Sequence, residues 1–228
     1  MTREPETGTR RRRTGRPRRD GTQVVGDPTT EILAVAGRLF GELGVEATTM
    51  SRIASEVGLG QSSLYYYFRS REEVVAALVA TANVVPLELI DRVTSSAGSV
   101  ASKLFRFVRS DVEVLCALPF DINEIHRIAA RERARFDGYW RERARLERRL
   151  SALVREGVAA GELRPVEPRL TALSILANDE GTQNWFRVGV RYSPSKSARA
   201  MATLTVAGLL ATPRTIDDVI DEVAALGS

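Results

Sequence analysis

Residues 48–68 read TTMSRIASEVGLGQSSLYYYF. The apolar residues between positions 53 and 57 follow the spacing of one helical face, and Gly58 ends that pattern. A second short run follows, in which Leu64 and Phe68 lie four residues apart. Two short helices joined by a tight turn are typical of a helix-turn-helix unit, whose first helix braces a second that can enter the major groove of DNA.

The segment before this unit has helix signals at both ends. Asp27 can cap a helix N-terminus, and Pro28 suits the first helical turn. From Ile32 onward, apolar residues at i, i+1, i+4, i+7 and i+8 predict a helix that runs to Leu43 and ends at Gly44. A third helix therefore precedes the helix-turn-helix pair.

Capping residues mark the other helix starts. Thr48 or Thr49 can cap the second helix, and Gly60 occupies the N-cap of the third, where it offers no side-chain oxygen. Ser70 and Glu73 have the spacing of a capping box that opens a fourth helix. These signals predict three helices and the start of a fourth, which together make one compact unit.

Many positions between residues 29 and 78 agree with one known sequence pattern. They are Ile32, Leu33, Ala36, Leu39, Phe40, Gly44, Thr48, Thr49, Ile53, Ala54, Gly58, Leu64, Tyr65, Tyr67, Phe68, Ser70, Arg71 and Glu72. On these residues, the chain resembles the TetR family of bacterial transcriptional regulators. The resemblance implies an all-α fold, with an N-terminal three-helix helix-turn-helix DNA-binding domain and a larger C-terminal helical domain for ligand binding and dimerisation.

Three positions depart from the residues that are usual in that family. Gly60 stands where serine is common, Arg52 where an acidic residue is frequent, and Arg71 where lysine is usual. Arg71 keeps the positive charge and adds a planar fork that can hold a phosphate through two hydrogen bonds. Arg52 can add a contact to a base or to the DNA backbone that an acidic residue would repel.

The third helix of the unit is expected to carry the side chains that read bases. Gln61 at its start can pair with an adenine, a contact that contributes about 1 to 3 kcal/mol of discrimination. Three consecutive tyrosines cover about 300° of a helix, so we expect at least two of them on the DNA face. Core packing of the tyrosines and a solvated Gln61 are the alternatives. The predicted DNA contacts are Thr49, Ser51, Arg52, Gln61, Ser62, Ser63, Tyr65, Tyr66, Tyr67 and Arg71, with Arg16 and Arg18 from the N-terminal segment.

All the excess positive charge lies in residues 1–27, which hold eight arginines and four acidic residues, whereas the remainder holds 25 of each sign. Residues 28–79 contain four arginines and six acidic residues, so the DNA-binding domain alone is negative. We interpret the segment as a disordered arm that follows phosphates or places Arg16 and Arg18 in the minor groove. A solvated, charged leader is the alternative.

Beyond residue 79, the apolar spacing predicts further helices. The predicted helices run from Ser70 to about Val93 with a kink at Pro86, and then over about 100–118, 123–129, 136–161, 168–188, 194–210 and 215–226. We expect three segments: the arm at 1–27, the DNA-binding domain at 28–79, and the regulatory and dimerisation domain at 80–228. In the family, the last long pair forms a four-helix bundle with a second copy, and the small residues of 194–210 suit such packing. An internal helix interface is the alternative.

The resemblance also implies an inducer pocket among the C-terminal helices. The candidate lining residues are Phe105, Phe120, Tyr139, Trp140 and Trp185, with His126, Asn178 and Gln183 as polar anchors. Ordinary core packing is the alternative for each of them. The small number of polar candidates favours a mostly apolar small molecule.

Composition narrows the remaining classes. The chain is 43% hydrophobic and 27% charged, which is ordinary for a soluble globular protein. No uninterrupted run of about 18 apolar residues and no apolar segment after the basic N-terminus occur, so we expect a cytoplasmic protein without a membrane span. One histidine and one cysteine, Cys116, leave no cluster with metal-ligand spacing, and Cys116 is expected to be buried.

We also find no nucleophile–base pair and no glycine-rich phosphate loop, so we expect neither a cofactor nor enzymatic activity. The sequence therefore predicts a DNA-binding transcriptional regulator. We expect a repressor that binds a palindromic operator as a dimer and is released by a small-molecule inducer. A sequence-tolerant or architectural DNA-binding protein without a ligand response is the alternative.

Overall fold

The computed structural model of the chain describes residues 27–187, 189 and 191–227, so the arm with Arg16 and Arg18 lies outside the described residues. In the described part the regular structure is α-helical. The helices are α1 (Pro28–Leu43), α2 (Met50–Val57), α3 (Gln61–Tyr67), α4 (Arg71–Thr81), α5 (Val84–Ser95), α6 (Val100–Ala117), α7 (Ile122–Arg131), α8 (Asp137–Ala159), α9 (Pro168–Trp185), α10 (Pro194–Ala207) and α11 (Ile216–Ala225).

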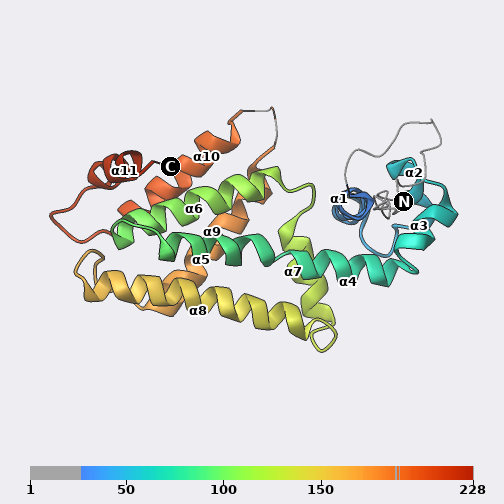
Figure 1. Ribbon diagram of the computed structural model, residues 1–228, viewed down its shortest axis with the longest axis horizontal. Helices are drawn as coiled ribbons and strands as arrows, with labels where there is room; N and C mark the ends of the chain where they lie inside the picture. The colour runs from blue at the N-terminus through green and yellow to red at the C-terminus, as the bar shows by residue number, and fades with distance from the viewer. Residues whose placement is uncertain (1–26, 188, 190, 228) are drawn as a thin grey trace, which may run out of the picture.

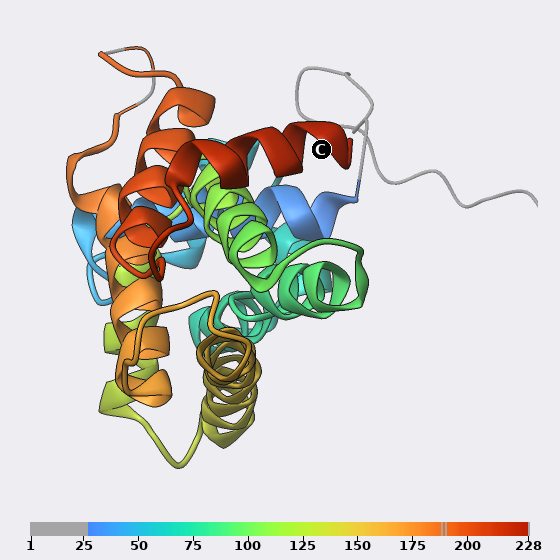
Figure 2. The ribbon, with the colours of Figure 1, turned by 90° about the vertical axis from the view of Figure 1, so that its left-hand side faces the viewer.

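The helices are arranged in an elongated molecule (Figure 1). α1, α2 and α3 gather at one end, and α4 leads from them to α5 and the larger helical region. α8 runs along one side of that region, and α10 and α11 lie on the side away from it (Figures 1 and 2). α4 is therefore the main covalent link between the small end and the large region.

Two hydrophobic cores hold these parts together. One core combines α1 to α4 with residues of α7 and the start of α8, such as Ile125 and Tyr139. The other joins α5, α6, α8, α9, α10 and α11, around side chains such as Leu104 and Leu150 that have no exposed surface. The N-terminal three-helix unit therefore shares its core with α7, which is far from it in sequence.

The predicted caps are confirmed at the start of the chain. The Asp27 carboxylate accepts a hydrogen bond from the backbone N–H of Thr29 at 3.2 Å, and α1 begins at Pro28 and ends at Leu43 as predicted. Thr49, and not Thr48, caps α2. Gly58 ends α2 with φ of 75°, a left-handed conformation that glycine adopts without a steric penalty.

The break in the fourth predicted helix lies one turn earlier than expected. The sequence predicted a kink at Pro86, but α4 ends at Thr81 and α5 begins at Val84. A proline ring clashes with the carbonyl of the residue four positions before it, which is Ala82. The helix therefore breaks at residues 82 and 83, and Pro86 sits in the first turn of α5.

The capping pattern at the start of α4 is formed only in part. The Ser70 hydroxyl accepts a hydrogen bond from the backbone N–H of Glu73 at 3.2 Å, as predicted. The Glu73 carboxylate accepts from the backbone N–H of Arg69 at 2.7 Å, one residue before the cap. Both bonds still satisfy N–H groups at the helix entrance.

Residues 71–95 form a stretch that is long and apolar enough to cross a membrane by length and composition alone, with a mean hydropathy of 1.7. No such stretch was expected from the sequence. In the structure it is divided into α4 and α5, and its buried side chains, such as Val74 and Ile90, belong to the two cores. Buried core helices have the same composition as spanning helices. Cys116 is buried, as its apolar neighbours predicted.

Candidate functional site

α3 presents an exposed, largely polar face at the small end of the molecule. Leu64, on the opposite side of the helix, has no exposed surface and anchors α3 in the N-terminal core. Tyr66 is 84% exposed, the largest exposure among the large hydrophobic side chains of this unit. The exposed residues of α3 are Gln61, Ser62, Tyr65 and Tyr66, and the half-buried ones are Ser63 and Tyr67.

The angle between α1 and α2 is held by a buried threonine. Thr48 is fully buried, and its hydroxyl oxygen lies 2.9 Å from the carbonyl oxygen of Gly44 and 3.3 Å from that of Leu39. A buried hydroxyl with such partners fixes the chain between the helices, because the alternative is an unsatisfied polar group. This contact sets where α2, and with it α3, begins.

The predicted DNA contacts at the start of α2 are exposed, but the positive charge among them is partly neutralised. Thr49 and Ser51 are exposed, and the Thr49 hydroxyl accepts a hydrogen bond from the backbone N–H of Arg52 at 3.2 Å. The Arg52 guanidinium pairs with Glu56 at 3.2 Å, and Glu56 also pairs with Arg38 of α1 at 2.9 Å. Arg52 is therefore near the exposed face, with an acidic neighbour that competes with phosphate for it.

Arg71 is engaged within the protein. Its guanidinium donates hydrogen bonds to the carbonyl oxygens of Val45 at 3.1 Å and Glu46 at 3.0 Å, and pairs with the Glu46 carboxylate at 3.1 Å. In this position Arg71 ties the turn between α1 and α2 to the start of α4. The structure does not bring it onto the open face of α3.

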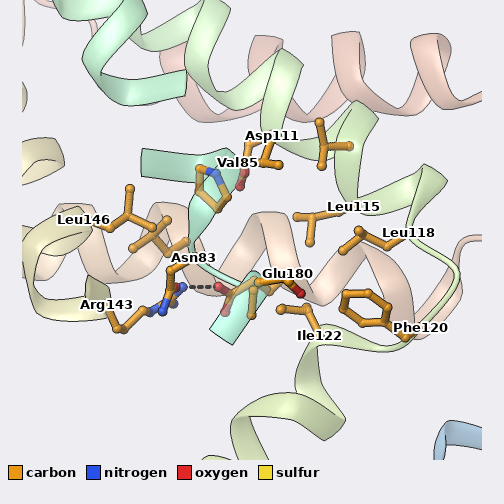
Figure 3. A pocket seen from close by; sticks show the side chains of 15 residues that line it. Asn83, Val85, Asp111, Leu115, Leu118, Phe120, Ile122, Arg143, Leu146 and Glu180 are labelled. Carbon is orange, nitrogen blue, oxygen red and sulfur yellow. Dashed lines mark hydrogen bonds and ion pairs between the residues drawn. The ribbon is translucent and has the colours of Figure 1, made fainter. Parts of the chain in front are cut away.

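A small cavity lies beside the break between α4 and α5, among α5, α6, α8 and α9 (Figure 3). Its volume is about 40 Å³. One water molecule takes about 30 Å³ in the liquid, whereas small-molecule sites have roughly 300 to 1,000 Å³. Its labelled apolar lining residues are Val85, Leu115, Leu118, Phe120, Ile122 and Leu146, and its labelled polar ones are Asn83, Asp111, Arg143 and Glu180.

The Glu180 carboxylate gathers the positive groups at this cavity. Nη1 of Arg143 lies 2.5 Å from Oε1 of Glu180, and Nε2 of His126 lies 3.4 Å from Oε2. Burial acts to raise the pKa of the Glu180 carboxyl, but His126 and Arg143 together hold that pKa below its usual value. Nδ1 of His126 is hydrogen-bonded to the Tyr139 hydroxyl, and Asn83 donates to the Tyr139 carbonyl at 3.1 Å.

Asp111 and Asp179 are buried beside this pair and have no such partners. Asp111 lines the cavity and is 3% exposed, while Asp179 has no exposed surface and neither of its carboxyl oxygens has a hydrogen-bond partner among the described residues. Burial, with repulsion from Glu180, raises the pKa of Asp111 to about 7 against the opposing charge of Arg143. Burial, then repulsion from Asp111 and Glu180, raises the pKa of Asp179 well above its usual value. Burial therefore favours the protonated form of both carboxyl groups.

Two family models match this chain. The model described as "Bacterial regulatory proteins, tetR family" matches residues 32–78, and that described as "Tetracyclin repressor-like, C-terminal domain" matches residues 97–209. The chain belongs to the TetR family. The resemblance drawn from the residues of α1 to α4 and the predicted all-α fold are therefore confirmed.

Curated relatives of this TetR-family chain match over its N-terminal region. The HTH-type transcriptional repressor KstR2 of Rhodococcus jostii is 41% identical over 59 residues, which are 26% of this chain and 29% of that relative. KstR2 of Mycobacterium tuberculosis is 43% identical over 49 residues, 22% of this chain and 24% of that protein. The chain thus matches less than a third of these relatives' length.

Solved structures extend the similarity in fold over most of the chain. The ketosteroid transcriptional regulator KstR2 of Mycobacterium tuberculosis has a TM-score of 0.72 at 21% identity, over 82% of this chain and 97% of that one. The TetR-family regulator PfmR from Thermus thermophilus has a TM-score of 0.68 at 27% identity, over 77% and 96%. AibR in complex with isovaleryl coenzyme A and operator DNA has a TM-score of 0.64 at 21% identity, over 78% and 97%.

Of the residues predicted to line a ligand pocket in this TetR-family chain, Phe120 does line the cavity. His126 and Tyr139 lie behind Glu180 and orient it without lining the cavity. Gln183 donates to the carbonyl oxygens of Leu115 at 2.8 Å and Phe120 at 3.1 Å. Gln183 therefore shapes the cavity wall through the backbone.

The structure places the other four predicted ligand residues away from the cavity. Phe105 is buried in the C-terminal core, and the indole N–H of Trp140 donates to the Ala129 carbonyl at 3.2 Å. Asn178 lies on the outer side of α9, and Trp185 is 50% exposed. Aromatic or polar identity does not determine which face of its helix a residue occupies.

Four polar residues that line the cavity were not predicted from the sequence: Asn83, Asp111, Arg143 and Glu180. A signal for Asp111 was present, because it lies seven residues after Leu104 and so continues the apolar stripe of α6. An acidic residue on an apolar stripe indicates a buried carboxyl with a special role. No comparable signal marks Asn83, Arg143 or Glu180, because none of them interrupts an apolar stripe in the sequence.

Proposed function

We propose that this chain is a ligand-responsive transcriptional repressor that binds a palindromic operator as a homodimer and releases it when a small molecule enters the cavity. The observation that carries this proposal is the position of α4. One end of α4 follows the exposed face of α3, and the other end borders the cavity. A change in the cavity can therefore move the helix that positions the DNA-binding unit.

The exposed face of α3 supports the DNA-binding part of the proposal. Gln61 and Ser62 stand at the start of the helix, where a recognition helix meets base edges. Tyr65 and Tyr66 are exposed along the same helix and can contact the DNA backbone or a thymine methyl. Arg71 contributes, on this proposal, by fixing the turn before α2.

The proposed coupling between the cavity and the DNA-binding unit follows from the small size of the cavity. A space of about 40 Å³ must expand before it can hold a drug-sized ligand. Thr81 at the end of α4 lines the cavity together with Ala82 and Asn83, the two residues between α4 and α5. Expansion at this break displaces α4, and the start of α4 carries Arg71 and the turn of the DNA-binding unit.

A second connection reaches the DNA-binding unit from α7 and α8. The Arg135 guanidinium donates to the Glu72 carbonyl at 2.9 Å, between the end of α7 and the first turn of α4. His126 of α7 lies against Glu180 at the cavity. A ligand shifts this two-state equilibrium only by the ratio of its affinities for the two states, and operator affinity falls by the same factor.

The homodimer is supported by an apolar stripe on the outer side of α9 and α10. Leu170 is 64% exposed, Trp185 50% and Leu204 71%. Ala177 on α9 and Gly208 directly after α10 are small and exposed, so another helix can approach closely there. Self-association through one patch on both copies gives the two-fold symmetry that a palindromic operator requires.

Leu204→Glu tests the dimer. The substitution places a charge at the centre of the patch without disturbing either core, so we expect a monomer with unchanged helix content. Analytical ultracentrifugation would measure the mass, with Leu226→Glu as the matched control at an exposed leucine away from the stripe. A variant that remains dimeric would contradict the proposed interface.

Selection of bound DNA from a random pool tests the operator, and footprinting on the selected site tests the mode of binding. We expect one protected palindrome with half-sites a helical turn or a multiple apart. Uniform protection without a preferred sequence would instead favour the architectural alternative. A screen for small molecules that release the selected DNA then tests the ligand response.

A further inference from the structure

The charges around the cavity do not balance. Three carboxyl groups, those of Asp111, Asp179 and Glu180, lie together in the protein interior. The guanidinium of Arg143 and the imidazole of His126 are both directed to Glu180. Among the described residues neither aspartate forms an ion pair, because Arg143, whose charge also acts on Asp111, is bonded to Glu180. Asp111 is the aspartate that lines the cavity (Figure 3).

We propose that the inducer of this protein is an organic ammonium ion, an apolar molecule that carries one protonated amine, and that its ammonium group binds the Asp111 carboxylate. This proposal rests on the proposed function, because it names the class of ligand that the cavity takes. It adds a charged group to the mostly apolar molecule that the sequence favoured. A carboxylate buried in an apolar site binds a cation through hydrogen bonds of roughly twice the usual strength.

The apolar part of the ligand has a matching surface. Leu115, Leu118, Phe120, Leu146 and Leu176 are among the side chains that line the cavity. These side chains gain contact with an alkyl or aromatic body and offer no hydrogen bonds to a polar one. The site therefore matches a molecule with a single polar end.

An anionic ligand matches the same site poorly. Arg143, the cation that lines the cavity, is already within 2.5 Å of Glu180. A ligand carboxylate or phosphate near Arg143 would have to displace Glu180 and would then face Asp111 as well. Like charges held together in a low-dielectric interior repel strongly, so such a ligand loses affinity in this cavity.

Binding of the ammonium ion replaces a proton. Burial favours the protonated form of the two aspartates, and the bound ammonium provides the positive charge in place of such a proton. The carboxyl proton leaves to solvent, the amine keeps its own protons, and the total charge of the site is unchanged. The groups that face Asp111 are Asp179 and Glu180 from α9 and Arg143 from α8, with His126 of α7 reaching Glu180.

The test compares three probes with the same chain length and different head groups: octylamine, octanol and octanoate. Calorimetry on the full-length protein without DNA gives their dissociation constants, and repeating it in buffers of different ionisation enthalpy counts the protons released. We expect octylamine to bind at least about tenfold more tightly than the other two, with proton release. Operator release by the same probes is measured separately.

Asp111→Asn keeps the shape of the side chain and removes its charge. We expect this variant to lose about tenfold or more in octylamine affinity and to keep its affinity for octanol. Asp221→Asn, at an exposed position of α11, is the matched control and should bind all three probes as the unmodified protein does. A melting curve confirms that each variant is folded.

The outcomes separate the two proposals. Octanol or octanoate binding as tightly as octylamine, no octylamine binding, or unchanged octylamine affinity in Asp111→Asn would each overturn the ammonium site. Octylamine that binds through Asp111 but does not release the selected operator supports the site and contradicts the proposed ligand response. Operator release by a different class of molecule, with no octylamine binding, supports the response and overturns the ammonium proposal.

Discussion

The two regions that α4 connects, the face of α3 and the cavity, differ in how their polar side chains are exposed to water. On α3, Gln61 and Tyr66 point to solvent, where an unpaired polar group is hydrated at no cost to folding. At the cavity, Asp111 and Asp179 are removed from water, and this burial raises the pKa of both carboxyl groups. The polar groups of α3 are hydrated when no partner is bound, whereas the two aspartates at the cavity are buried without an ion pair among the described residues.

This difference shows how each region is expected to use its ligand. On the proposed function, the α3 face would gain DNA contacts by adding them to a folded, hydrated surface, so its exposed residues can change without disturbing the core. The cavity contains carboxyl groups that destabilise the folded chain, and a ligand that pairs with them removes that penalty. Residues that lower stability at a site are expected where binding, rather than folding, requires them.

The largest expected effect comes from removing the buried charge. Asp111 has a pKa of about 7 in the folded chain and an ordinary value of 3.8, so the folded state binds more protons than the unfolded state between these values. The contribution of the protonated Asp111 carboxyl to stability is therefore fully present below its ordinary pKa of 3.8 and is lost as pH rises through about 7. We expect Asp111→Asn to raise the free energy of unfolding above pH 7 by up to about 4 kcal/mol.

Urea denaturation at a series of pH values measures this effect. The difference between Asp111→Asn and the unmodified protein should shrink as pH falls and vanish below about pH 3, where the aspartate is protonated in both states. Asp221→Asn, on the exposed surface of α11, should show no such trend. A pH-independent difference would mean that Asp111 is not a buried acid, and the contrast with α3 would fail.

The helices near the N-terminus could be predicted from sequence because their limits are local. Asp27 caps the helix that begins at the next residue, and Thr49 caps α2 through the N–H of Arg52 three residues away. Gly58 ends α2 because glycine tolerates positive φ. Each signal and its effect lie within one helical turn, so a single sequence contains both.

The cavity could not be predicted in the same way, because it exists only where separate helices meet. The charged residues that line the cavity come from three helices. Asp111 and Glu180 are 69 positions apart in the sequence, and Arg143 comes from α8. The stripe of α6 marks Asp111 as buried, but no local pattern shows which helix faces it. Trp185 illustrates the converse, since a large aromatic residue expected in a pocket lies 50% exposed on the outer side of α9.

A second prediction concerns the charge of the DNA-binding end. Residues 28–79 have fewer arginines than acidic residues, and Glu56 pairs with both Arg38 and Arg52. The exposed face of α3 therefore has little positive charge of its own, and the arginines of residues 1–19 are expected to supply it. We expect deletion of residues 1–19 to weaken operator binding by roughly tenfold to a hundredfold at moderate salt.

The salt dependence of binding distinguishes this role from a solvated leader. Each phosphate neutralised adds about 0.9 to the slope of log K against log salt concentration, so the deletion should flatten the slope. The comparison is made by fluorescence anisotropy on the selected operator at several salt concentrations. The same slope with and without the segment would assign the phosphate contacts to the folded unit instead.

The smallest expected effect is at the most exposed tyrosine. Tyr66 is 84% exposed, so Tyr66→Ala should change the free energy of unfolding by less than about 0.5 kcal/mol. On the proposed DNA face the same change should weaken operator binding by roughly 1 to 2 kcal/mol, about tenfold. Tyr192→Ala removes a 39% exposed tyrosine from the far region and should alter neither quantity. Full operator affinity in Tyr66→Ala would contradict a DNA contact at this face. The exposure of α3 would then be no more evidence of DNA binding than the exposure of any other helix on the surface.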